Sequence, residues 1–425
     1  MSISTGVTRR DFVRTATAAS IAAAFPGNFP VFAQGSDAIR VGVIGCGGRG
    51  TGAAIDCLKG VTGVEIVALG DLVPDRVESA LARLTKEFPD RVKVPADRRF
   101  TGFDNYKKVC ALPDVNLIIT AAPPGFRPIH LKAAIEAGKH VFMEKPVAVD
   151  PVGVRSVIAS SALAKQKNLA IVAGTQRRHQ KHYLEMLKRI QDGQIGEIVA
   201  AQCYWNMGDL WVKERTPQMS EMEWQCRNWL YFSWLSGDHI VEQHVHNIDV
   251  VNWAMGVMPK NVMGMGGRQV RTAPQFGNIF DHFAIEYEFP NGVRAASYCR
   301  QTKGAAERVE ERIVGTKGVA WSTGSAGRIT GEKPWEFKGE QINPYVQEHI
   351  DLIASIRAGT PLNEGRQIAE STMCAIMGRM SAYTGRALSW DWAMNASTLD
   401  LSPAKYEFGP NPVDAVAIPG TTPLV

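Results

Sequence analysis

Several features that would indicate other classes of protein are missing from this sequence or scarce in it. The seven cysteines are odd in number and scattered, and no two of them form a C-x-x-C pair. They are typical of small core residues in a chain that folds in a reducing compartment, and they do not indicate a disulfide framework. No internal repeat is found. Beyond the N-terminal segment no apolar run is long enough to span a membrane.

The sequence also carries little net charge. Its formal charge of +5 over 425 residues falls by two if residues 1–33 are removed, because that segment holds three arginines and one aspartate. Such a surface is not basic enough to indicate a nucleic acid as partner. With 45% hydrophobic and 21% charged residues, the chain can bury a large core and is expected to form two domains of a soluble enzyme.

An export signal occupies the N-terminus. Arg9 and Arg10 precede a short apolar stretch, and the small residues of Val31-Phe32-Ala33 suit cleavage before Gln34. An amphipathic helix is the alternative, but the apolar stretch has almost no polar face. This pattern predicts a twin-arginine signal peptide at 1–33. That route exports folded proteins, so we expect a periplasmic protein that carries its cofactor with it.

The first motif after the signal predicts a dinucleotide site. The β-rich run Ile39 to Ile44 leads into Gly45-Cys46-Gly47-Gly48-Arg49-Gly50, which opens a helix, and a second apolar strand ends in Asp71. Gly45 allows the tight turn, Gly47 lets the backbone approach the pyrophosphate, and Gly50 lets the helix pack against the strand. A carboxylate at Asp71 would bind the adenosine ribose and repel a 2′-phosphate, so NAD is expected in preference to NADP.

Further strand and helix units follow, in "VNLIITAAPP", "RPIHLKAAIEAG" and "HVFMEKP". Ligands of open parallel sheets bind at the carboxyl ends of strands, which places Ala122, Pro123, Glu144 and Lys145 near the nicotinamide. An exposed charged turn is the alternative for Glu144-Lys145. The predicted cofactor-binding residues are Gly45, Gly47, Gly48, Arg49, Gly50, Asp71, Ala122, Pro123, Glu144 and Lys145.

The glycine motif, the acidic end of the second strand and the Glu144-Lys145-Pro146 block resemble the glucose-fructose oxidoreductase and inositol dehydrogenase family (Gfo/Idh/MocA). The resemblance runs from about Ile39 to Trp392. It implies an α/β fold with an N-terminal Rossmann domain, followed by an α/β domain with a large, mostly antiparallel sheet that commonly builds dimers or tetramers. It also implies that Lys145 lies between nicotinamide and substrate.

The family's other catalytic residues lie on a helix, for which "DHIVEQHVHNIDVVNWAMG" is the candidate. Apolar residues follow helical spacing there, so Glu242, His246 and Asp249 are expected to share one face. Glu242 stands where the family has aspartate. Its carboxylate would orient His246, while His246 or Lys145 takes the proton of a substrate hydroxyl. The predicted catalytic residues are Lys145, His246 and Glu242.

Two other interpretations of this helix remain open. One turn could present Glu242 and His246 to zinc, but His244 points away from His246 and no third ligand has a fixed spacing, so no metal is expected. The same polar residues could simply satisfy a domain interface. Burying them without partners would be costly, which disfavours that view.

A sugar is the expected substrate. Five of the ten tryptophans lie between Trp205 and Trp234, interspersed with arginines and tyrosines, and flat rings beside forked donors suit a sugar. The segment "GTQRRHQKHY" follows a strand whose loop borders the substrate in the family. The predicted substrate-binding residues are Arg178, His179, Tyr183, Trp229 and Asp249.

The sequence therefore predicts the domains 1–33, 34–160 (NAD-binding), 161–400 (substrate-binding and oligomerisation) and 401–425, a proline-rich tail along the surface or across a subunit boundary. The predicted function is hydride transfer from a ring carbinol of a sugar or glycoside to tightly bound NAD. Three outcomes stay open: redox-neutral glycoside cleavage, a sugar-sugar oxidoreductase or simple polyol dehydrogenase, and a non-catalytic nucleotide-binding protein.

Overall fold

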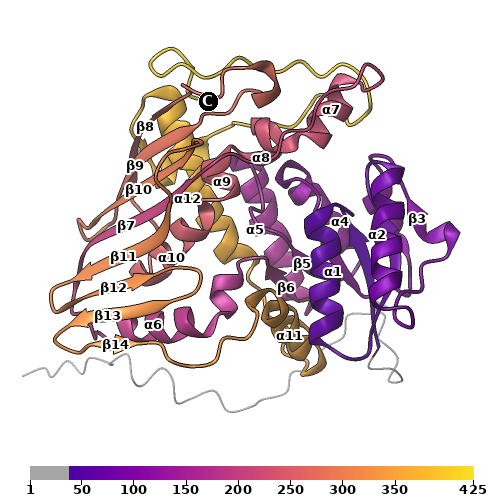
Figure 1. Cartoon of the computed structure of the whole chain (residues 1–425), viewed down its shortest axis with the longest axis horizontal. Helices are drawn as coiled ribbons and strands as arrows, with labels where there is room; N and C mark the ends of the chain where they lie inside the picture. Colours follow the sequence, from indigo (N-terminus) through magenta and orange to yellow (C-terminus); the bar gives the residue numbers. More distant parts are fainter. Residues whose placement is uncertain (1–37) are drawn as a thin grey trace, which may run out of the picture. The chain divides into compact units, whose positions relative to one another are not determined.

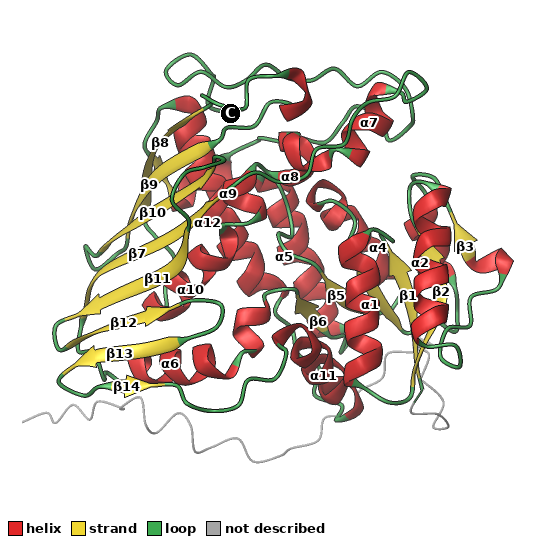
Figure 2. Cartoon of the chain, in the orientation of Figure 1, coloured by secondary structure: helices red, strands yellow, loops and turns green. Residues whose placement is uncertain are grey.

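The computed structural model describes residues Ala38–Val425, which form one unit (Figure 1). The predicted signal peptide at 1–33 lies outside the described residues. Two sheets organise the described part, with helices around them (Figure 2). None of the helices within it combines the length and the apolar character that crossing a bilayer requires.

The first sheet is fully parallel, as expected of a Rossmann domain. Its strands are β1 (Ile39–Ile44), β2 (Val64–Gly70), β3 (Arg99–Phe100), β4 (Leu117–Thr120), β5 (His140–Met143) and β6 (Ile171–Ala173). They follow the order β3-β2-β1-β4-β5-β6, and every neighbouring pair is parallel. The central strands β1 and β4 are buried almost throughout because helices cover both faces, which explains their largely apolar sequences.

The helices of this part are α1 (Gly48–Gly60), α2 (Pro74–Glu87), α3 (Asn105–Ala111), α4 (Arg127–Glu136) and α5 (Pro151–Gln166). A later helix, α11 (Pro344–Arg357), returns from the far end of the chain and packs on α1. The expected boundary between residues 160 and 161 falls inside α5, and after this helix β6 still pairs with β5. The parallel sheet therefore extends beyond that boundary to Ala173.

The second sheet has nine strands: β7 (Ile198–Met207), β8 (Asn261–Gly267), β9 (His282–Glu288), β10 (Arg294–Gln301), β11 (Arg308–Gly315), β12 (Gly318–Ser322), β13 (Gly327–Gly331), β14 (Trp335–Glu336) and β15 (Leu388–Ser389). Their order is β14-β13-β12-β11-β7-β10-β9-β8-β15, and only the pair β10 and β7 is parallel. The predicted α/β fold with a mostly antiparallel second sheet is confirmed.

Helices cover one face of this second sheet (Figure 1). They are α6 (Lys181–Gln191), α10 (Val245–Met255) and α12 (Gly365–Thr384), and the short α9 (His239–Glu242) also contacts β10. The short α7 (Glu221–Arg227) and α8 (Ser233–Ser236) lie away from this sheet, on the side of the first domain (Figure 1). Residues alternate between buried and exposed along β9 and β10, as a sheet with one covered face requires. On the other face Met263 and Met265 are 62% and 71% exposed.

The predicted continuous helix around His246 is interrupted. The chain forms α9 and then α10, and Gln243 and His244 lie between them. Backbone bonds still link the two pieces, from His244 N–H to His239 O at 3.2 Å and from His246 N–H to Gln243 O at 3.3 Å. The break changes which side chains share a face, and this determines the geometry of the site.

Candidate functional site

The glycine-rich turn has the geometry that a dinucleotide needs. Gly45 has a φ of +88°, a conformation that L side chains rarely adopt. A Cβ added to Gly50 would lie 1.8 Å from the carbonyl oxygen of Gly45, so only glycine allows α1 to start this close to the strand. A Cβ on Gly47 or Gly48 would meet nothing within 4 Å, which leaves the helix N-terminus open to a ligand.

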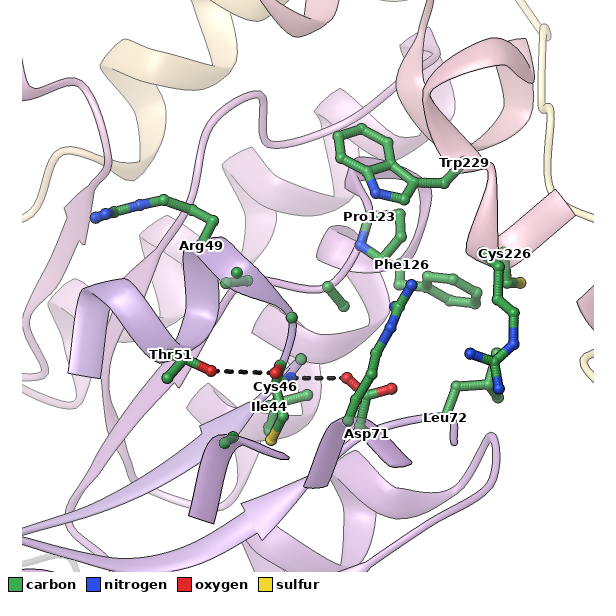
Figure 3. A pocket seen from close by; sticks show the side chains of 18 of the residues that line it. Ile44, Cys46, Arg49, Thr51, Asp71, Leu72, Pro123, Phe126, Cys226 and Trp229 are labelled. Atoms are coloured by element: carbon green, nitrogen blue, oxygen red, sulfur yellow. Dashed lines mark hydrogen bonds between the residues drawn. The ribbon is translucent and has the colours of Figure 1, made fainter. Parts of the chain in front are cut away.

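Asp71 follows β2 directly and closes the same turn. Its carboxylate accepts the Cys46 N–H at 2.7 Å (Figure 3) and the Val73 N–H at 3.2 Å. Burial raises the pKa of Asp71 above its ordinary value, and the nearby Arg76 guanidinium opposes that rise. The side chain lines a cavity, and its remaining acceptor capacity would suit the hydroxyls of an adenosine ribose bound there.

That cavity has a volume of about 630 Å³. The glycine turn, Asp71 and the residues Ala121 to Pro123 after β4 form one side of it. The opposite side comes from the second domain, and its members there are Trp211, Lys213, Cys226, Arg227 and Trp229. We call residues 209–229 the cover segment. The residues present fit a dinucleotide, since a glycine turn, a helix N-terminus and an acidic strand end meet in one cavity.

The cover segment is attached to the first domain by an ion pair. Arg227 donates to both carboxylate oxygens of Asp75 on α2, at 3.0 and 2.9 Å. Glu223 accepts from the same guanidinium at 2.9 Å. Asp75 and Arg227 both line the cavity, so this pair connects its two sides between α2 and α7.

The C-terminal tail lies over the cover segment. The carbonyl of Gly409 accepts the Met222 N–H at 3.1 Å, and Gln225 and Asn411 exchange two hydrogen bonds of 2.6 and 2.8 Å. The ring of Phe408 packs against Phe103, a cavity residue, at 5.2 Å between centroids. The predicted tail along the surface therefore also supports the cavity wall.

Arg49 points away from Asp71 in Figure 3 and reaches the far end of the site. It donates to Glu144, contacts Asp56 at 3.1 Å and lies 3.6 Å from Glu348 of α11. Glu348 is completely buried, and burial, with Glu144 adding to it, raises its pKa well above the ordinary value. Gly174 makes room for Glu144, because a Cβ there would lie 2.4 Å from its carboxylate.

Lys145 and Glu242 meet across the two domains. The Lys145 amine donates to the Glu242 carbonyl at 2.6 Å and lies 3.3 Å from its carboxylate. Each side chain is 13% exposed. Lys145 follows β5, the neighbour of β4, and the residues after β4 line the cavity. Lys145 thus comes from the same edge of the parallel sheet as the cavity, although it is not itself among the lining residues.

His246 lies beside this pair but does not bond to it. The expectation that Glu242 orients His246 is wrong, because the break before α10 turns the Glu242 carboxylate to Lys145. The His246 ring stacks on Trp205 at 5.7 Å between centroids. Burial, with the charges of Lys145 and Arg177, lowers the pKa of His246 well below its ordinary value. His246 is thus held neutral.

Three predicted substrate-binding residues are engaged with the protein itself. Arg178 donates two hydrogen bonds of 2.8 Å to the Asp249 carboxylate, and Ser371 donates to the same carboxylate at 2.7 Å. His179 lies 2.6 Å from Asp351 and 3.2 Å from Glu364. These pairs connect the loop after β6 to α10, to α11 and to the start of α12, so we assign them a structural role.

The other two also lie away from the Lys145 amine. Tyr183 is 0% exposed, and its hydroxyl donates to the buried Glu311 at 3.0 Å. Trp229 lines the cofactor cavity because the cover segment folds back over α2 after β7 ends. Of the tryptophan-rich segment, Trp205 is the member that stacks on the candidate catalytic histidine.

The structure also adds residues to the site that the sequence did not single out. Gln243 follows Glu242 in the chain, and Gln301 donates to its side-chain oxygen at 2.6 Å. Arg227 and Lys213 complete the cavity wall. An arginine facing an aspartate on α2, or two glutamines from distant segments, has no signature in a single sequence, because only the folded chain brings them together.

Comparisons with known proteins agree with this geometry. Residues 39–175 match the model of an oxidoreductase family with an NAD-binding Rossmann fold, and residues 183–321 match the GFO/IDH/MocA C-terminal domain. The chain is 27% identical to inositol 2-dehydrogenase 3 of Saccharopolyspora erythraea over 76% of this chain and 87% of that protein. It is 25% identical to glycosyl hydrolase family 109 protein 1 of Bacteroides fragilis, over 65% of this chain and 56% of that protein.

Solved structures show the same fold. The aldose-aldose oxidoreductase of Caulobacter crescentus, complexed with glycerol, superposes with a TM-score of 0.65 at 18% identity and covers 83% of this chain and 99% of its own. Both matched models belong to one family, follow in the order of the two sheets and together span most of the described residues. The chain is an NAD-binding oxidoreductase and belongs to the Gfo/Idh/MocA family.

Proposed function

We propose that the protein oxidises a ring carbinol of a sugar, glycoside or cyclic polyol, with bound NAD as the hydride acceptor. The observation that carries the proposal is the contact between Lys145 and Glu242, an amine and a carboxylate from the two domains. Lys145 follows β5, the strand next to β4, and the residues after β4 line the cofactor cavity. The inositol dehydrogenase and aldose oxidoreductase relatives support a polyhydroxylated substrate.

The side chains divide the work of the reaction. Lys145 faces the reacting hydroxyl and exchanges its proton, while Glu242 holds the amine in place. His246, kept neutral by burial, donates its one N–H to the oxygen of the same hydroxyl and fixes its direction. Trp205 offers a ring beside them on which the apolar face of a sugar can stack.

A panel of sugars and cyclitols tests this proposal. Each compound is added to the NAD-loaded protein, and the near-ultraviolet absorbance of reduced nicotinamide is followed. At least one compound should reduce the cofactor in the wild type but not in Lys145→Met. Lys132→Met, at a lysine whose side chain is 62% exposed on α4, is the control. A panel that leaves the cofactor oxidised throughout would contradict the proposed substrate class.

A second candidate is redox-neutral glycoside cleavage. Oxidation at C3 acidifies the proton at C2, the group at C1 leaves, water adds at C1 and the hydride returns to C3. The cover segment supports it, because a cycle that closes on one cofactor requires that the cofactor stay bound. The family 109 relative points the same way. Release of aglycone over many turnovers, without added NAD or carbonyl acceptor, would distinguish this route from a sugar-sugar oxidoreductase, which stalls after one.

We further propose that the chain is exported with NAD bound and forms a dimer or tetramer. The twin arginines support export, and the exposed Met263 and Met265 on the open sheet face support assembly through that face. Nucleotide released on denaturing protein collected from the periplasm should amount to about one NAD(H) per chain. Light scattering before and after Met265→Lys checks the assembly.

A further inference from the structure

Gln243 occupies an unusual place beside the predicted catalytic pair. It directly follows Glu242, the last residue of α9, and α10 starts only at Val245. Its side chain is partly exposed, whereas the following five residues are buried. Because the helix is interrupted at this point, contacts with other segments, and not regular helix geometry, orient the Gln243 amide.

Those contacts form a relay of three side chains. Arg271 donates to the amide oxygen of Gln301, and the amide nitrogen of Gln301 donates to the Gln243 oxygen at 2.6 Å. Arg271 comes from the loop between β8 and β9, and Gln301 is the last residue of β10. Both are almost completely buried, at 2% and 0% exposed.

The direction of this relay follows from the chemistry of arginine. A guanidinium only donates, so the oxygen of Gln301 must face Arg271 and its nitrogen must face Gln243. Gln243 must then offer its oxygen to Gln301. Arg271 is itself held between the rings of Tyr231 and Phe276, at 5.4 and 5.7 Å from their centroids. The hydrogen bond from Arg271 thereby determines which end of each of the two amides is the oxygen and which is the nitrogen.

We infer that Gln243 binds substrate through its amide nitrogen, as a fixed hydrogen-bond donor to one hydroxyl of the sugar or polyol. Its oxygen is occupied by Gln301, so the nitrogen is the group left for a ligand. The inference rests on the proposed function, because it places that hydroxyl next to the one that Lys145 deprotonates. Arg271 and Gln301 act as positioning residues behind it.

This arrangement makes the site selective. The Lys145 and Glu242 pair binds the reacting hydroxyl, while Gln243 requires an oxygen at a neighbouring carbon. A substrate that lacks this oxygen leaves an oriented donor unpaired in a partly buried site, which weakens binding by about tenfold or more. The same donor favours a hydroxyl or ring oxygen over an ammonium group, which has no acceptor.

Two substitutions test the inference in different ways. Gln243→Leu removes the donor and keeps the volume. Gln301→Glu leaves Gln243 intact but places a carboxylate before it, so that Gln243 turns its nitrogen to this new acceptor and its oxygen to the substrate. Gln243→Leu should weaken binding of the preferred polyol about tenfold. Gln301→Glu should weaken it less, because the substrate hydroxyl can donate to the Gln243 oxygen that now faces it. Gln180→Leu, at a buried glutamine that bonds Gly324 elsewhere, is the matched control.

The measurement is calorimetric titration of the NAD-loaded protein with myo-inositol and its monodeoxy analogues, with NAD affinity and the unfolding temperature as checks. The wild type should discriminate against one analogue by about tenfold, and Gln243→Leu should lose that discrimination. A Gln243→Leu variant that binds and discriminates like the wild type would overturn the assignment of Gln243 alone. A wild type that binds neither myo-inositol nor any analogue would overturn both the assignment and the proposed substrate class.

Discussion

The two ends of the site are built by different means. At the adenosine end, the glycine turn and Asp71 come from neighbouring strands that follow each other in sequence, and they face an open cavity of about 630 Å³. At the catalytic end, Lys145 and Glu242 are 97 residues apart and nearly buried. Binding of the cofactor thus depends on local backbone geometry, whereas proton transfer depends on how the two domains pack.

The sharpest test of this contrast is Lys145→Met. Loss of a positioned acid-base group should lower hydride transfer by roughly 10²-fold or more. NAD binding should change little, because Lys145 is not part of the cavity wall. Single-turnover reduction and equilibrium titration with NAD measure the two effects separately. If both fell together, the two ends would not be independent.

The reverse test is Asp71→Ser at the adenosine end. Loss of a charged acceptor for ribose hydroxyls should weaken NAD binding by roughly 10-fold or more. Binding of NADP should improve relative to NAD, because the nearby Arg76 is then free to meet a 2′-phosphate. Nucleotide titrations measure this ratio, with the exposed Asp90→Ser as control. An unchanged preference would exclude Asp71 from ribose recognition.

The contacts of His179 with Asp351 and Glu364 should make the free energy of unfolding depend on pH. Burial opposes protonation of His179, but hydrogen bonds with Asp351 and Glu364 raise its pKa from 6.5 to about 9. A raised pKa stabilises the fold fully below 6.5, and this contribution is lost as the pH rises through about 9. It amounts to roughly 1–2 kcal/mol, less than the full pKa difference gives, because water screens the partly exposed Asp351.

Urea unfolding across that range measures the effect. The free energy of unfolding should fall with rising pH in the wild type, and His179→Gln should flatten this part of the curve. His282→Gln, at a histidine that is 46% exposed beside Asp281, serves as control. Equal slopes in the wild type and His179→Gln would show that the pair contributes nothing to stability.

The smallest effect is expected at the cover segment. Arg227→Ala removes the pair with Asp75, and an ion pair this exposed contributes roughly 1 kcal/mol or less. NAD should then leave about two- to fivefold faster. Competition with a fluorescent NAD analogue measures the release rate, and Arg215→Ala, which breaks an exposed pair with Glu221 within the segment, is the control. Equal release rates in both variants would remove the ion pair from cofactor retention.

The sequence predicted the adenosine end well because its residues act through local geometry. Gly45 and Gly50 are required by a turn that spans a few residues, and Asp71 ends the next strand. The two sheets were likewise anticipated from periodicity and resemblance. The length of the parallel sheet was not, because β6 is a short apolar run whose membership depends on its pairing with β5.

The catalytic end was predicted less completely. Lys145 and Glu242 do meet, but the helix break redirects Glu242 from His246 to Lys145. Nothing in the spacing marks that break, because Gln243 and His244 are compatible with a helix. Tyr183 illustrates the same limit: a tyrosine near a site suits a sugar or a buried carboxylate equally well, and Glu311 is supplied by a strand far along the chain.

The contact between the tail and the cover segment has a consequence for biosynthesis. Asn411 enters the chain 186 residues after its partner Gln225, and Gly409 likewise follows Met222 late in synthesis. A nascent chain can therefore form the glycine turn and the cover segment long before the tail contacts that hold the segment are made. Nucleotide would then meet the cavity while one of its walls is still unsupported. Removal of residues 402–425 should keep the wall in that state, while leaving the glycine turn and Asp71 intact.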